Sequence, residues 1–125
     1  MNDDYNYIEN VQYWLDNMDI KKYTINDNLT VDVDGDVDIS EKRLTEIPIQ
    51  FGKVNGNFYC DSNYLTTLEG CPDYVKGDFW CAFNPLRSIL FLPKYIGNKC
   101  YCSKEFHNSI EYKRYEVTKK VKELS

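Results

Sequence analysis

The chain has 125 residues, a formal net charge of -5 at pH 7 and a hydrophobic content of 42%. This length allows one small domain, and the hydrophobic content argues against a wholly disordered chain. The acidic balance argues against direct binding of nucleic acid, which needs clustered Lys and Arg. The longest apolar run, residues 89–92, is too short to span a membrane.

Residues 1–30 predict an N-terminal helical cap followed by a hairpin. Apolar side chains recur there at helical spacing, at Ile8, Val11, Leu15 and Met18. Asp3 and Asp4 suit the start of that helix. Residues 26–28 (Asn-Asp-Asn) are typical of a turn, with the next strand expected from Leu29. The segment lacks the apolar core of a secretory signal, so we expect a cytoplasmic protein.

A repeat follows. Residues 54–60 (VNGNFYC) recur as residues 75–81 (VKGDFWC), and weaker copies at the same 21-residue offset cover 33–39 and 96–102. A unit this short cannot bury its own apolar face, whereas a stack of such units can. Each copy alternates apolar and polar residues, which predicts one strand per coil in a parallel sheet. The repeated glycines relieve the backbone at one position, and Asn63 and Asn84 are expected to bond to turn backbone.

The stretch F-x-C-x-x-N-x-L-x-x-L at 58–68 resembles the core of a leucine-rich repeat. The whole unit is similar to short repeats of phage and bacterial proteins. This resemblance covers residues 31–103 and implies an α/β solenoid of about four coils with a leucine-rich-repeat-like parallel β-sheet. Beyond it the pattern fails at His107, and residues 104–125 predict a C-terminal capping helix with a capping-box-like start at 108–111.

Alternation assigns the side chains of each coil to two faces. The inward rows are Val37-Phe58-Phe79-Cys100 and Ile39-Cys60-Cys81-Cys102, so the cysteines are interpreted as small core residues. Tyr59, Trp80 and Tyr101 then form an outward column in solvent, where aromatic residues favour binding. The alternatives are an aromatic ladder that only stabilises the sheet and a stripe that the chain's own termini cover. The candidate partner-binding residues are Tyr59, Trp80, Tyr101, Asp36, Asp38, Asp61 and Asp78.

The aspartates at positions 32, 34, 36 and 38 are expected on one strand face and admit three interpretations. One is a calcium loop with Gly35 at its sixth position, but Thr30 replaces the first carboxylate and the flanking helices are missing. Another is a row that mimics the phosphates of DNA. The third, which we favour, is an acidic patch that keeps an edge coil soluble and steers a basic partner.

The cysteines and the single histidine do not predict a catalytic or metal site. Five cysteines in a cytosolic chain predict neither a disulfide framework nor a metal quartet. His107 has no obvious nucleophile as a partner. Leu90 and Phe91 replace Glu69 and Gly70 of the previous coil; the C-terminal helix is expected to cover them, and otherwise they form a second contact patch.

We therefore expect a protein-binding module, not an enzyme, without cofactor or metal. The partner is expected to be a protein with a basic surface, and neither nucleic acid nor a membrane. By analogy, the resemblance to phage proteins implies an inhibitor or modulator of a host defence protein, acting in the host cytoplasm by steric or electrostatic blocking. The alternative is a structural, self-associating homo-oligomer.

Overall fold

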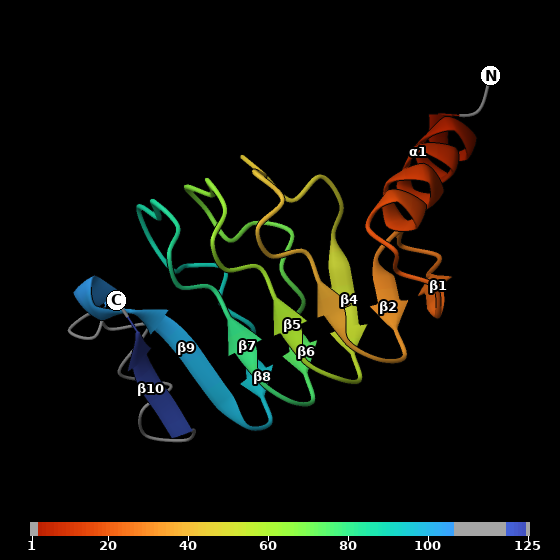
Figure 1. Ribbon diagram of the computed structural model, residues 1–125. Helices are drawn as coiled ribbons and strands as arrows, with labels where there is room; N and C mark the ends of the chain where they lie inside the picture. Colours follow the sequence, from red (N-terminus) through yellow and green to blue (C-terminus); the bar gives the residue numbers. More distant parts are fainter. Residues whose placement is uncertain (1–2, 107–119, 125) are drawn as a thin grey trace.

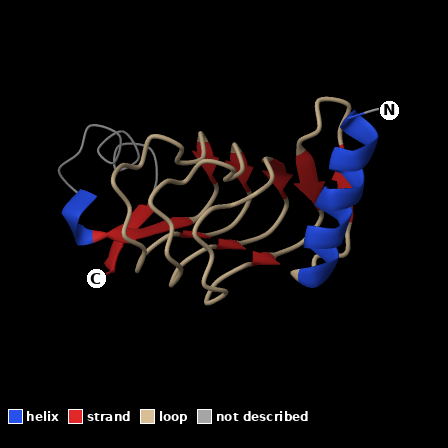
Figure 2. Cartoon of the chain, turned by 90° about the horizontal axis from the view of Figure 1, so that it is seen from above, coloured by secondary structure: helices blue, strands red, loops and turns tan. Residues whose placement is uncertain are grey.

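We analysed a computed structural model, which describes residues 3–106 and 120–124. The chain winds about three times around one core, as a β-solenoid built from parallel strands (Figure 1). The only α-helix among the described residues is α1 (Asp3–Asn17). It lies at the N-terminal end of the stack, and β9 and β10 lie at the opposite end (Figure 2).

The strands form two sheets, which we call sheet A and sheet B. Sheet A has the order β1 (Tyr23–Ile25), β2 (Val31–Val33), β4 (Phe51–Val54), β6 (Tyr74–Val75) and β8 (Tyr95–Ile96). Sheet B has the order β10 (Lys120–Leu124), β9 (Lys99–Ser103), β7 (Phe79–Trp80), β5 (Phe58–Tyr59) and β3 (Val37–Asp38). All neighbouring strands are parallel except β1 and β2.

The expected single strand per coil is wrong, because each coil bends between a strand of sheet A and a strand of sheet B. The bend falls at the repeated glycine. At Gly56, an added Cβ would lie 2.5 Å from the carbonyl carbon of Gly35 in the coil below. The glycine is therefore needed for the close approach of successive coils, as the sequence suggested.

The predicted register and core are confirmed. Phe58 pairs with Phe79, and Phe79 pairs with Cys100, at the 21-residue offset of the sequence repeat. Both inward rows are fully buried, and the rings of Phe58 and Phe79 are stacked with centroids 5.7 Å apart. The apolar rows of successive coils therefore form one continuous core.

At the N-terminal end, the predicted helix and hairpin are present. Val11 and Leu15 of α1 are buried in the common core, and the ring of Trp14 lies 6.2 Å from that of Phe51. In the hairpin, β1 pairs with β2 in antiparallel orientation. Leu29 does not begin the second strand, because it adopts a positive φ of 69° within the turn.

At the C-terminal end, the segment 104–125, for which a helix is expected, is described only at residues 104–106 and 120–124, and neither of these parts is α-helical. Residues 104–106 form a 3-10 turn, and β10 pairs in parallel with β9, again at an offset of 21 residues. A strand here satisfies the N–H and C=O groups along β9, which a helix would leave unpaired. The predicted capping-box start at 108–111 and His107 lie outside the described residues.

Two buried asparagines tie the coils together, which confirms their expected role. Asn84 Oδ1 accepts hydrogen bonds from the backbone N–H groups of Asn63 and Leu65, and its Nδ2 donates to the carbonyls of Cys60 and Cys81. Asn63 makes the equivalent bonds one coil earlier. Each amide therefore satisfies backbone groups of two neighbouring coils.

The candidate site on the outer face of sheet B

The predicted aromatic column lies on the outer face of sheet B. Tyr59, Trp80 and Tyr101 come from β5, β7 and β9, which pair in register. The ring centroids of Tyr59 and Trp80 are 6.0 Å apart, and those of Trp80 and Tyr101 are 4.1 Å apart. The alignment of the three rings is therefore as expected.

The three rings differ in exposure, so the prediction that all three lie in solvent holds only in part. Tyr59 and Trp80 are half-buried, whereas Tyr101 is only 8% exposed. Tyr101 can therefore offer little area to a partner, and its ring serves as a support for Trp80. The indole Nε1 of Trp80 is buried and has no hydrogen-bond partner among the described residues.

Carboxylates surround the Tyr59 ring. The pKa of the Tyr59 hydroxyl is raised, mainly by burial and to a smaller extent by the negative charges of Asp36, Asp78 and Asp38. Burial also raises the pKa of Asp61, to which the nearby charges of Asp38 and Glu41 add. Asp36, Asp38 and Asp78 thus place negative charge around one half-buried ring, and Asp61 lies near Asp38.

These carboxylates form no ion pair within the described part of the chain. The only ion pair there joins Lys21 and Asp19, far along the sequence from the column. We call Tyr59, Trp80, Asp36, Asp38, Asp61 and Asp78 the acidic aromatic face. Its unneutralised charge favours a cationic ligand and repels phosphates.

Two of the aspartates also hold the coils together. Asp36 Oδ1 accepts a hydrogen bond from the backbone N–H of Asn57, and Asp78 Oδ1 accepts one from that of Lys99. Asn57 Oδ1 does the same for Asp78 N–H, so the three side chains form a ladder along the bend. Asp36 and Asp78 were predicted as binding residues, and the repeat pattern did not reveal this structural role.

The aspartates of residues 32–38 do not share one strand face, which corrects the sequence analysis. Because the coil bends at Gly35, Asp32 lies on sheet A and Asp38 on sheet B. Asp32 Oδ1 accepts a hydrogen bond from Lys53 N–H, and Asp38 Oδ1 accepts two from Ser40. Among the described residues, no group of three or more His, Cys, Asp or Glu side chains is placed to hold a metal ion.

A second aromatic pair, which the sequence analysis did not assign to a face, lies on the outer side of sheet A. The rings of Tyr74 and Tyr95 are stacked at 4.8 Å, and the Lys53 ammonium lies 5.5 Å from the Tyr74 ring centroid. The match of Tyr74 with Tyr95 at the repeat offset was the available signal. This column is cationic at one end and differs in that respect from the face of sheet B.

Leu90 and Phe91 form an exposed apolar pair, with exposed fractions of 69% and 49%. Most of the C-terminal helix expected to cover them falls on residues 107–119, which lie outside the described residues. They border a cavity of about 290 Å³ together with Phe51 and Leu92.

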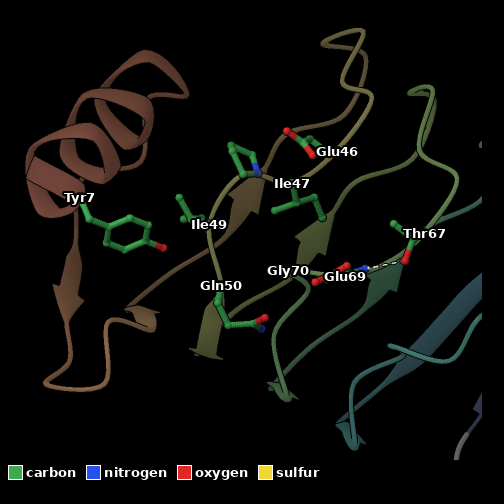
Figure 3. A pocket seen from close by; sticks show the side chains of 9 residues that line it. Tyr7, Glu46, Ile47, Ile49, Gln50, Thr67, Glu69 and Gly70 are labelled. Atoms are coloured by element: carbon green, nitrogen blue, oxygen red, sulfur yellow. Dashed lines mark hydrogen bonds between the residues drawn. The ribbon is translucent and has the colours of Figure 1, made fainter. Parts of the chain in front are cut away.

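A cavity of about 370 Å³ separates α1 from the loops of the first two coils. Tyr7 extends from α1 toward the segment with Ile49 and Gln50, and Glu46 and Glu69 lie on the other sides (Figure 3). Nothing in the sequence pointed to this cavity. Its side chains provide hydrogen-bonding groups but no pairing of a nucleophile with a base.

The five cysteines are buried, free thiols, as predicted for core residues. A hydrogen bond with Cys71, together with burial, raises the pKa of the Cys60 thiol. A hydrogen bond with Cys102 and burial do the same for Cys81. Raised thiol pKa values remove the thiolate that nucleophilic or metal chemistry needs.

Comparison with protein-family models, with curated proteins and with solved structures found no match to this chain. No helix within the described residues is long and apolar enough to cross a lipid bilayer.

Proposed function

We propose that the protein is a binding module for a protein partner with a basic surface, and that it uses the acidic aromatic face. The observation that carries this proposal is the half-exposed Tyr59–Trp80 pair, with rings 6.0 Å apart, among carboxylates without ion-pair partners in the described chain. Tyr and Trp give large contact area at low cost in conformational entropy. The surrounding charge supplies attraction and orientation.

The fold itself does not require aromatic residues at this position. In the first coil the same place in the column is taken by Asp38, and β3 still pairs with β5 in register. A ladder needed only for stability would be expected in every coil. This difference supports a binding role for Tyr59 and Trp80.

We further infer that α1 caps the N-terminal end of the solenoid, because Val11 and Leu15 bury the apolar end of the core. The leucine-rich-repeat-like character and the role against a host defence protein remain predictions from the repeat pattern. Self-association is the alternative function, and the exposed Leu90 and Phe91 favour it.

The test compares three baits in affinity capture with quantitative mass spectrometry: the wild type, Tyr59→Ala/Trp80→Ala, and the control Tyr74→Ala/Tyr95→Ala on sheet A. The proposal expects a protein that the wild type and the control retain and the first variant loses, while circular dichroism shows all three folded. A partner retained equally by all three would contradict it. Light scattering of the wild type over a range of concentrations separates binding from self-association.

A further inference from the structure

We infer that the acidic aromatic face recognises arginine, in preference to lysine, on an extended basic segment of its partner. This inference rests on the proposed binding function and specifies the chemistry of the ligand. It follows from the way the carboxylates are held around the rings.

The carboxylates of Asp36 and Asp78 are fixed in orientation. Each uses Oδ1 to accept a backbone N–H of the next coil, at 2.7 Å for Asp36 and 3.0 Å for Asp78. The Oδ2 atoms accept no hydrogen bond within the described part of the chain, so each remains available as an acceptor. Such side chains lose little conformational freedom when a ligand binds.

The Tyr59 ring lies among these acceptors. Asp36, Asp78 and Asp38 all act on its hydroxyl, and Asp38 is its direct neighbour in the column. On the other side of Tyr59, Trp80 adds a larger ring at 6.0 Å. A cation placed here therefore meets aromatic surface and carboxylate oxygens at the same time.

A guanidinium group suits this arrangement better than an ammonium group. It is planar, stacks on aromatic rings and carries N–H donors along its edge, so it can contact a ring and reach carboxylates on either side. An ammonium group is a compact and strongly hydrated charge, which loses more hydration against the rings. The negative charge alone would attract a guanidinium and an ammonium group equally. The preference for arginine therefore comes from contact with the aromatic rings.

The experiment uses two peptides of equal length and charge, each with three cationic residues separated by Gly and Ser; one carries arginine and the other lysine. The protein carries Trp14→Phe, so that Trp80 is its only tryptophan. Isothermal titration gives both dissociation constants, and Trp80 fluorescence reports contact with the ring. We expect the arginine peptide to bind about fivefold more tightly than the lysine peptide.

Three variants locate the preference. Tyr59→Leu and Trp80→Leu, each in the Trp14→Phe protein, should reduce the ratio of the two dissociation constants toward one, whereas Tyr74→Leu on sheet A should leave it unchanged. Asp36→Asn should weaken both peptides and keep the fold, because Asn57 performs the same ladder role one coil later. Titration calorimetry serves where the indole is removed, and urea unfolding verifies each variant.

Equal affinities for the two peptides, a preference that survives both ring substitutions, or no binding of either peptide would each overturn the inference. A captured protein that depends on Tyr59 and Trp80 would still support the proposed function in those cases. If capture of the partner did not depend on Tyr59 and Trp80 while the arginine peptide still bound more tightly than the lysine peptide, the proposed function would be wrong and the arginine site would be retained.

Discussion

The asparagine ladder predicts a large and specific loss of stability on Asn84→Ala. The substitution removes an acceptor for the N–H groups of Asn63 and Leu65, both at 3.1 Å, and a donor to the carbonyls of Cys60 and Cys81, at 3.0 and 3.2 Å. A buried polar group left without a partner costs about 1–3 kcal/mol. Water entering the space recovers part of this, so we expect a loss of about 3–5 kcal/mol, a large share of the roughly 5–15 kcal/mol typical of a domain.

Urea unfolding followed by tryptophan fluorescence measures this loss. The control is Asn98→Ala, because Asn98 is exposed and its side chain makes one hydrogen bond within the described residues, to Asp78 at 2.6 Å. The control should cost less than about 1 kcal/mol. Asn63→Ala combined with Asn84→Ala should be non-additive, since Asn63 N–H donates to Asn84 Oδ1. If Asn84→Ala costs no more than Asn98→Ala, the ladder does not stabilise the stack as described.

Three further predictions follow from the titratable groups and the indole. The folded-state pKa of Asp61 is raised, so its ionised form disfavours folding. Asp61→Asn should therefore stabilise the protein at neutral pH by less than about 1 kcal/mol, and this gain should vanish as the pH falls below the carboxyl pKa of the unfolded chain. A gain that is the same at every pH would contradict the prediction. The five thiols should react with a disulfide reagent only as fast as the protein opens, and all at once in urea; rapid labelling of the native state would refute their burial. Trp80→Phe should raise the free energy of unfolding by about 1 kcal/mol, because it removes a buried N–H without a partner; a loss of stability would show that the indole is satisfied.

The register and the core could be predicted from the sequence, because the offset of the repeat gives the register and its equivalent apolar positions give the core. Phe58 and Phe79 stand at equivalent places, and stacking equal units in register brings them into contact. The two-sheet arrangement was not predicted because Val54 and Phe58 both face inward in either geometry. Four residues apart, they fit one straight strand as well as two strands joined by a bend at Gly56.

The outer surface was less predictable, because exposure depends on what other segments cover. Alternation placed Tyr59 and Tyr101 on the same face, but only the fold shows that one is half-buried and the other buried. The C-terminal strand was missed for a related reason. Residues 120–124 keep the repeat offset with β9 although the aromatic and asparagine signals have disappeared, and the backbone edge of β9 imposes no side-chain pattern that alternation could detect.

The inward and outward positions of each coil differ in what the stacking of the coils requires of them. Stacking of the coils requires apolar residues in the inward rows and asparagine at positions 63 and 84, because these side chains contact or hydrogen-bond to the neighbouring coil. Stacking does not require an aromatic residue at the outward position of Tyr59 and Trp80, because Asp38 occupies this position in the first coil. Within the described residues, the Asp38 side chain bonds to Ser40 of its own turn. At that position Trp80 brings a buried N–H without a partner in the described chain, which costs about 1–3 kcal/mol. A residue chosen for stability alone would avoid this cost, as phenylalanine does. The buried indole N–H therefore favours the proposed binding role of Trp80 over a purely stabilising one.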